Sequence, residues 1–230
     1  MFLPLHDETP MRNLRAPFVT YALLGFTVLA FLATGAGLIP GVATDSIARL
    51  GLFPAVLWGN AVLPPGYDQV PPLATLFTSA FLHVGWFHLA SNMLFLWVFG
   101  DNVEDALGHA GFLIFYLVCA AAAAIAHAAA FPMSDSPMIG ASGAVAGVVG
   151  AYLVLYPRVR LFGLIFNIIP VTLTASWVLG AWVLTQIYHA VMGDQPGVAW
   201  WGHIGGALAG ALMILPVKLG LVKLTQQRLG

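Results

Sequence analysis

The chain has 230 residues, of which 60% are hydrophobic and 7% are charged, and its formal net charge is -1. Soluble domains carry about 25% charged residues, so this composition excludes an ordinary soluble domain and indicates a helical membrane protein with one membrane domain. No basic stretch suggests nucleic acid as a partner, so none is expected.

Apolar runs of about 20 residues, the length of helix that crosses a bilayer, recur along the chain. Residues 1–17 are polar and broken by proline, unlike a cleaved signal peptide, and are expected to form a cytoplasmic N-terminal segment. The first apolar span covers 18–39, and the Pro- and Gly-rich residues 41–72 are expected to form a first loop in the membrane interface. The other spans are expected at 75–99, 111–131, 142–156, 173–192 and 199–217.

This pattern predicts an all-α fold, a polytopic bundle of six transmembrane helices. The membrane domain is expected over 18–222 and a cytoplasmic tail over 223–230, with a polar turn at 101–108 and an interfacial connector at 158–172. Six spans place both termini on one side, and all the basic residues except Arg49 fall on that side. The positive-inside rule therefore predicts cytoplasmic termini. The short chain favours a bacterial cytoplasmic (inner) membrane.

The fourth span is too short for a full crossing. Its 15 residues from Ser142 to Tyr156 make about 22 Å of helix, whereas the hydrocarbon core is about 30 Å thick. The helix is therefore expected to begin below the outer surface, with Ser142 at a buried N-terminus between Gly140 and Gly143. The unpaired N–H groups of such an end suit a developing oxyanion, which makes Ser142 the candidate nucleophile.

A serine hydroxyl needs a base beside it to act as a nucleophile, and the histidines are the candidates. Span six, which carries His203 near its outer start, and span four both have small residues one helical turn apart. These are Gly202, Gly206 and Gly210 in span six and Ser142, Ala146 and Gly150 in span four. Such faces let two helices pack closely, so His203 is predicted to lie level with Ser142 and to act as its base.

The second span adds His88 and Asn92, which lie one helical turn apart on one face. Both side chains are hydrogen-bond donors that suit an oxyanion site. Polar groups at this depth are costly unless they face the protein interior or a wet cavity, so both are expected to point inward.

Three motifs together resemble the rhomboid family of intramembrane serine proteases. The GASG sequence at 140–143 resembles the GxSG motif of that family, HLASN at 88–92 resembles its HxxxN motif, and GHIGG at 202–206 resembles the catalytic-histidine segment of its sixth helix. The order and spacing of the motifs also agree, and the resemblance covers about residues 10–220.

The resemblance implies a Ser142–His203 dyad without a third acid, and an oxyanion site made by His88, Asn92 and the backbone N–H of Ser142. It implies hydrolysis of transmembrane protein substrates in the lipid bilayer, near their outer ends, without a cofactor. His83 matches a recurrent family position, and Glu104 resembles a conserved acid with a structural role. The supporting residues are Gly140, Gly143, His83, Gly202 and Gly206.

Two positions depart from the family pattern. Many members carry an aromatic–Arg pair before the second helix, where this chain has Ala74 and Thr75, so the first loop needs other anchors. Some members place a tyrosine one turn after the serine to stack on the histidine, where this chain has Ala146. We expect another group, such as Trp200 or Trp201, to orient His203 instead.

Other interpretations fit parts of this pattern. Taken singly, Ser142 and His203 each fit a helix-packing role, His88 and Asn92 fit ties between helices, and His83 fits a structural role as well as a wet cavity. Their combination at one depth favours catalysis.

Three other functions compete with serine proteolysis. The first is a catalytically inactive rhomboid-like protein that binds transmembrane helices, although such proteins usually lack the serine or the histidine. A transporter or channel predicts internal repeats and more intramembrane charge, and the sequence has neither. A metalloprotease predicts a His-Glu-x-x-His pair, which is also absent from the sequence, so no metal is expected.

Overall fold

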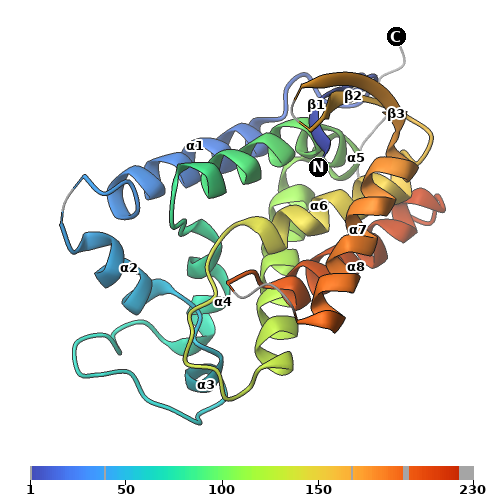
Figure 1. Cartoon of the computed structure of the whole chain (residues 1–230). Helices are drawn as coiled ribbons and strands as arrows, with labels where there is room; N and C mark the ends of the chain where they lie inside the picture. The colour runs from blue at the N-terminus through green and yellow to red at the C-terminus, as the bar shows by residue number, and fades with distance from the viewer. Residues whose placement is uncertain (1, 39, 167, 194–196, 223–230) are drawn as a thin grey trace.

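The computed structural model of the chain describes residues 2–38, 40–166, 168–193 and 197–222, and the fold over these residues is mostly helical (Figure 1). The predicted tail, 223–230, lies outside the described residues. The longer helices are α1 (Phe18–Thr34), α5 (Trp86–Ala130), α6 (Ser142–Leu155), α7 (Ala175–Met192) and α8 (Trp200–Lys218). The shorter helices are α2 (Val42–Leu50), α3 (Pro54–Leu57) and α4 (Thr75–Thr78), with 3-10 turns η1 (Pro72–Ala74) and η2 (Ser79–Phe81).

A three-stranded antiparallel sheet corrects the all-α prediction. Its strands are β1 (Phe2–Asp7), β2 (Arg160–Ile165) and β3 (Ile169–Thr174), in the order β1-β2-β3, and Figure 1 shows the sheet at one end of the molecule, at the upper right. The segment predicted as an interfacial connector is thus a hairpin. The sheet could not be predicted from the sequence because β2 is short and because β1, with which it pairs, is far away along the chain. Phe2, for example, pairs with Ile165.

Helix α5 corrects the predicted limits of spans two and three. Residues 82–85 are not helical, so the helix begins at Trp86 rather than at residue 75, and the short helix α4 precedes it. The predicted polar turn at 101–108 is confined to Gly108, whose positive φ of 72° divides α5 into two helical segments. The first segment runs beside α1 and the second beside α6 and α8 (Figure 1).

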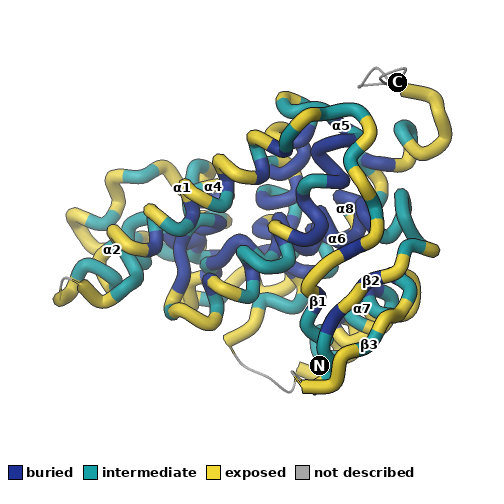
Figure 2. The backbone as a smooth tube through the Cα atoms, turned by 90° about the horizontal axis from the view of Figure 1, so that it is seen from above, coloured by how far each residue is buried: buried dark blue, intermediate teal, exposed yellow. Residues whose placement is uncertain are grey.

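Helix α6 lies at the centre of the core, packed against α5 and α8 (Figure 2). All its residues from 143 to 152 are buried. The predicted close packing of the fourth and sixth spans is confirmed, because a Cβ on Gly206 would lie 2.0 Å from the carbonyl oxygen of Gly143, and a Cβ on Gly210 would lie 2.0 Å from that of Gly147. On α6 the tight contacts with α8 therefore lie at Gly143 and Gly147, each one residue beyond the predicted Ser142 and Ala146, and at the predicted Gly150, where a Cβ would lie 2.2 Å from the carbonyl oxygen of Ala207. Ser142 stays only partly buried.

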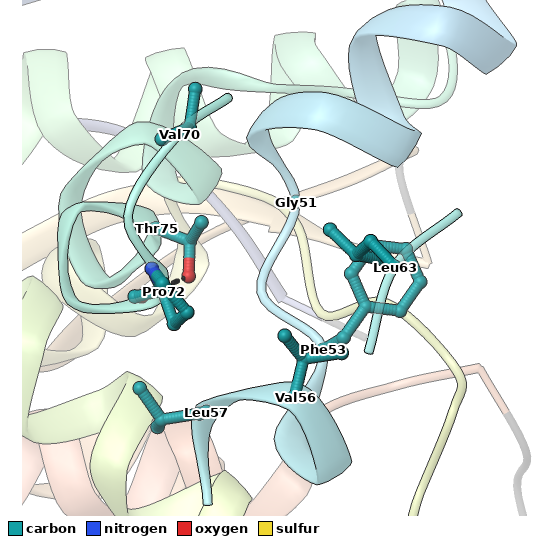
Figure 3. A pocket seen from close by; sticks show the side chains of 8 residues that line it. All are labelled: Gly51, Phe53, Val56, Leu57, Leu63, Val70, Pro72 and Thr75. Carbon is teal, nitrogen blue, oxygen red and sulfur yellow. Dashed lines mark hydrogen bonds between the residues drawn. The ribbon is translucent and has the colours of Figure 1, made fainter. Parts of the chain in front are cut away.

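The first loop is anchored without the aromatic–Arg pair. The backbones of Leu52 and Met138 form an isolated bridge, the indole N–H of Trp58 donates to the carbonyl of Ala128 at 2.9 Å, and the Thr78 hydroxyl donates to a loop carbonyl at 2.7 Å. The loop also encloses a mostly apolar pocket, shown in Figure 3. The side chains and backbone lining it are Gly51, Phe53, Val56, Leu57, Leu63, Val70, Pro72 and Thr75.

The lengths of the helices bear on the predicted bilayer crossings. Among the described residues, α5 and α8 are the two helices long and apolar enough to cross a membrane, whereas α1 and α6 are apolar but shorter. The six-span arrangement therefore stays a prediction.

Candidate active site

Ser142 is the first residue of α6, as the sequence predicted. Ala141 occupies the N-cap position, and within the described part of the chain no side chain caps this helix end. The first N–H groups of a helix have no intrahelical partners, and the aligned peptide dipoles favour negative charge there. Ser142 therefore stands beside backbone donors suited to an anionic oxygen.

His203 lies on the first turn of α8, directly against the serine. Its Nε2 atom is 2.8 Å from the Oγ atom of Ser142, a hydrogen-bonding distance. The residue His203 is 8% exposed, and the close contact between α6 and α8 keeps it level with Ser142. The structure thus brings the two predicted residues together, in the geometry that proton transfer between them requires.

The other side of the His203 ring meets a residue that the sequence analysis missed. The Nδ1 atom of His203 is 2.8 Å from Oε1 of Gln186 on α7, and the Gln186 side chain is buried. An available signal was that Gln186 is a strongly polar residue inside an apolar span, where such residues are costly and often functional.

Two tryptophans also border His203. The ring of Trp200 meets it edge to face with centroids 5.8 Å apart, and the ring of Trp182 lies 6.2 Å away. Trp200 was one of the two expected neighbours, whereas Trp201 is exposed. The position of Ala146 is fully buried in the core.

His88 lies against the loop that leads into α6. A Cβ built on Gly140 would be 2.8 Å from Nε2 of His88 and 3.8 Å from Oγ of Ser142, so the two side chains border the same small space. The φ of Gly140 is +117°, a region that L side chains rarely adopt. Glycine at this position therefore permits both the turn and the approach of the His88 ring.

Asn92 and His83 form a buried pair next to this space. The amide nitrogen of Asn92 donates to Nε2 of His83 at 3.0 Å, and the backbone N–H of Ala141 approaches the same ring nitrogen at 3.5 Å. The ring of His83 also packs edge to face on that of His88, with centroids 4.9 Å apart. His83 therefore connects Asn92 and His88 to the residue before Ser142.

The remaining predicted residues have packing or capping positions. Gly143 and Gly206 lie in tight contacts between helices and Gly202 lies against the loop residue Met138, and at each of them a Cβ would come within 2.8 Å or less of a neighbouring atom. Glu104 is fully buried, and its carboxylate accepts from the backbone N–H groups of Val19 and Thr20 at 2.9 and 2.7 Å. It therefore caps the N-terminus of α1, far along the chain from the serine.

Comparisons with known proteins point to one family. The family model described as the Rhomboid domain matches residues 71–218. Rhomboid protein 1, mitochondrial, of Saccharomyces cerevisiae is 30% identical over 174 residues, which cover 70% of this chain and 47% of that protein. Rhomboid protease GluP of Bacillus subtilis is 34% identical over 150 residues, covering 64% of this chain and 26% of that protein. The chain thus spans about half or less of the length of these relatives.

The names of the relatives correct one expectation. Besides the yeast mitochondrial protein, Rhomboid-like protein 11, chloroplastic, of Arabidopsis thaliana is 26% identical over 167 residues, covering 64% of this chain and 54% of that protein. The prediction of a bacterial cytoplasmic membrane is therefore wrong, because these names point to an organelle membrane. The prediction rested on the short length of the chain, and chain length carries no information on the compartment.

Proposed function

The chain belongs to the rhomboid family, and from this premise we propose that it is an intramembrane serine endopeptidase that cuts transmembrane helices with a Ser142–His203 dyad. The observation that carries the proposal is the 2.8 Å contact between the Ser142 hydroxyl and Nε2 of His203 at the N-terminus of α6. A packing serine needs no base, whereas a nucleophile does.

The proposed reaction is acyl transfer in two steps. The Ser142 oxygen attacks the carbonyl carbon of the scissile peptide while Nε2 of His203 takes the hydroxyl proton. The tetrahedral intermediate then collapses, and the leaving amine takes that proton from His203. Water attacks the resulting ester in the same way, which frees the carboxylate product and returns the proton to Ser142.

The negative oxygen of the intermediate needs donors in place before the reaction. We assign this role to the backbone N–H of Ser142, to His88 and to the second N–H of the Asn92 amide, whose first N–H is used by His83. His88 supports the assignment because it borders the space in front of Gly140 that Ser142 also borders. Donors fixed in advance stabilise the transition state without reorganisation.

The substrates we propose are transmembrane proteins, and the setting is a bilayer crossed by the six predicted spans. Helix α6 has 14 residues, which make about 21 Å of helix, and it is buried along most of its length. Ser142 then lies below the membrane surface, at a depth that a substrate helix reaches from within the bilayer.

The test compares the purified wild type with Ser142→Ala and His203→Ala in liposomes that contain a fluorescent transmembrane-helix reporter. The wild type should cut the reporter, and each variant should lose activity by about 1000-fold or more. Ser176→Ala and His6→Ala replace exposed residues of the same types and serve as matched controls. Cleavage by Ser142→Ala at the wild-type rate would disprove the dyad. If the wild type is inactive on the reporter, a fluorophosphonate that fails to label Ser142 would favour an inactive helix-binding protein.

A further inference from the structure

Gln186 is the buried polar residue of α7. Three α7 residues are buried, and the other two, Ala175 and Leu179, are apolar. Burying an amide without hydrogen bonds costs about 1–3 kcal/mol by the measure of protein mutants, and both ends of this amide are satisfied. Oε1 faces Nδ1 of His203 at 2.8 Å, while Nε2 donates to the carbonyl of Trp182 at 2.9 Å and lies 3.0 Å from the Thr185 hydroxyl.

These contacts determine which way the amide points. The carbonyl oxygen of Trp182 accepts hydrogen bonds and donates none, so the amide end that faces it is the NH₂ group. The oxygen of Gln186 must then face His203, and because that oxygen is an acceptor, Nδ1 of His203 carries the proton.

The tautomer decides whether His203 can act on Ser142. A neutral imidazole holds one proton, so a proton on Nδ1 leaves a lone pair on Nε2. Nε2 is the atom that lies 2.8 Å from Oγ of Ser142. We propose that Gln186 is a positioning residue that holds His203 in the tautomer and orientation in which Nε2 accepts the Ser142 proton. This inference rests on the proposed protease function and adds a neutral third member to the dyad.

Gln186 is an uncharged partner for His203, and this distinguishes the pair from a histidine held by a carboxylate. The titratable groups that act on His203 from the described part of the chain are His88 and His127 of α5, and α7 supplies an amide where a carboxylate would add a charge. Gln186 therefore orients the imidazole without stabilising its charged form. A carboxylate in its place would stabilise the charged form. Replacing Gln186 by glutamate therefore tests the effect of charge apart from the effect of orientation.

The experiment measures kcat and KM for reporter cleavage by the wild type, Gln186→Met and Gln186→Glu over a range of pH. Methionine keeps the length and volume of the side chain and removes the acceptor, so kcat should fall by about 100-fold with KM unchanged. Glutamate restores an acceptor for Nδ1, so it should recover most of kcat. It should also move the acidic limb of the kcat/KM profile to higher pH by about one unit or more.

Controls separate this role from simple packing. Leu184→Met alters an exposed side chain of the same helix and should leave kcat and KM at wild-type values. Unfolding temperatures of all variants in detergent establish that they are folded. A folded Gln186→Met with wild-type kcat would overturn the inference, as would a Gln186→Glu variant with the same loss as Gln186→Met and an unmoved acidic limb. Loss of cleavage by Gln186→Met counts only if the wild type cuts and Ser142→Ala does not, so failure of the protease proposal is recognised separately.

Discussion

At the scale of single residues, hydrogen bonds between side chains determine which atoms His203 and Asn92 present in the candidate site. His203 meets Gln186 on one side and Ser142 on the other, and Asn92 meets His83. A buried polar group left without a partner costs about 1–3 kcal/mol, so these pairs stabilise one arrangement of the site. Replacing one member of a pair should therefore change the behaviour of the other.

The Asn92–His83 pair leads to a prediction about the oxyanion site. Asn92→Ala removes one proposed donor and should lower kcat by about 100- to 1000-fold with little change in KM, because the donor acts on charge that develops in the transition state. His83→Ala should lower kcat less, because Asn92 remains but loses its orientation. Steady-state kinetics on the transmembrane reporter measures both effects.

The double variant tests whether the two residues act as a pair. If His83 acts through Asn92, His83→Ala should have little further effect once Asn92 is already alanine. Asn60→Ala is the matched control, because Asn60 is an exposed residue whose amide bonds to a loop carbonyl away from the serine. Effects of the two changes that add independently would contradict the proposed coupling.

At the scale of elements, the contact between α6 and α8 holds Ser142 and His203 at one level. Gly206→Val should push the two helices apart, because a Cβ at this position would lie 2.0 Å from the carbonyl oxygen of Gly143, and backbone yields little. We expect a loss of stability of about 1–3 kcal/mol and a fall in activity of about 100-fold or more, since an ångström of misplacement is enough to slow catalysis. Thermal unfolding in detergent and reporter cleavage check the two effects.

A control on the same helix distinguishes helix separation from a general effect of substitution. Leu208→Val changes a side chain of α8 that is 58% exposed, and it should alter neither the unfolding temperature nor cleavage. Wild-type activity in Gly206→Val would show that the helix contact does not govern the distance between Ser142 and His203.

At the scale of the whole molecule, the N-terminal strand is tied to the helices that carry the site. Asp7 at the end of β1 is buried, accepts a hydrogen bond from the Tyr152 hydroxyl on α6, and accepts another from the amide of Asn102 on α5 at 2.9 Å. Its strand also pairs with β2, which leads through β3 into α7. The sheet therefore links the N-terminus to both α6 and α7.

The burial of Asp7 predicts a pH dependence of stability. Desolvation raises the pKa of its carboxyl above the ordinary value, although the hydrogen bond from Tyr152 opposes the shift. At a pH between the ordinary and the raised pKa, the folded chain holds a proton on Asp7 that the unfolded chain has lost. This contribution to stability is therefore present at low pH and is lost as pH rises through the raised pKa. Asp7→Asn, which carries no charge, should gain stability relative to the wild type as pH rises from about 4 to about 7.

Unfolding temperatures in detergent at several pH values measure this difference. Asp68→Asn, at an exposed loop position, is the matched control and should show a difference from the wild type that does not grow with pH. A difference between Asp7→Asn and the wild type that stays constant over this range would contradict a buried, protonated Asp7.

Much of the candidate site was visible in the sequence, and much of the surrounding structure was not. The position of Ser142 at a helix start and its proximity to His203 followed from the short fourth span and from the small residues of two spans. The tight contacts of Gly143 and Gly147 with α8, the start of α5 at Trp86 and the role of Gln186 did not follow. Each of these depends on contacts between segments that are far apart in the chain.

The sequence by itself determined the membrane character, the family, the order of the apolar segments and the residues that carry the proposed chemistry, because composition, spacing and motifs are properties of neighbouring residues. Only the tertiary structure decided that β1 pairs with β2 and that the amide of Gln186 faces Nδ1 of His203. Hydrogen bonds of this kind depend on distance and direction to within a fraction of an ångström and a few tens of degrees. The packing of whole helices sets those quantities, and no local pattern in the chain encodes them.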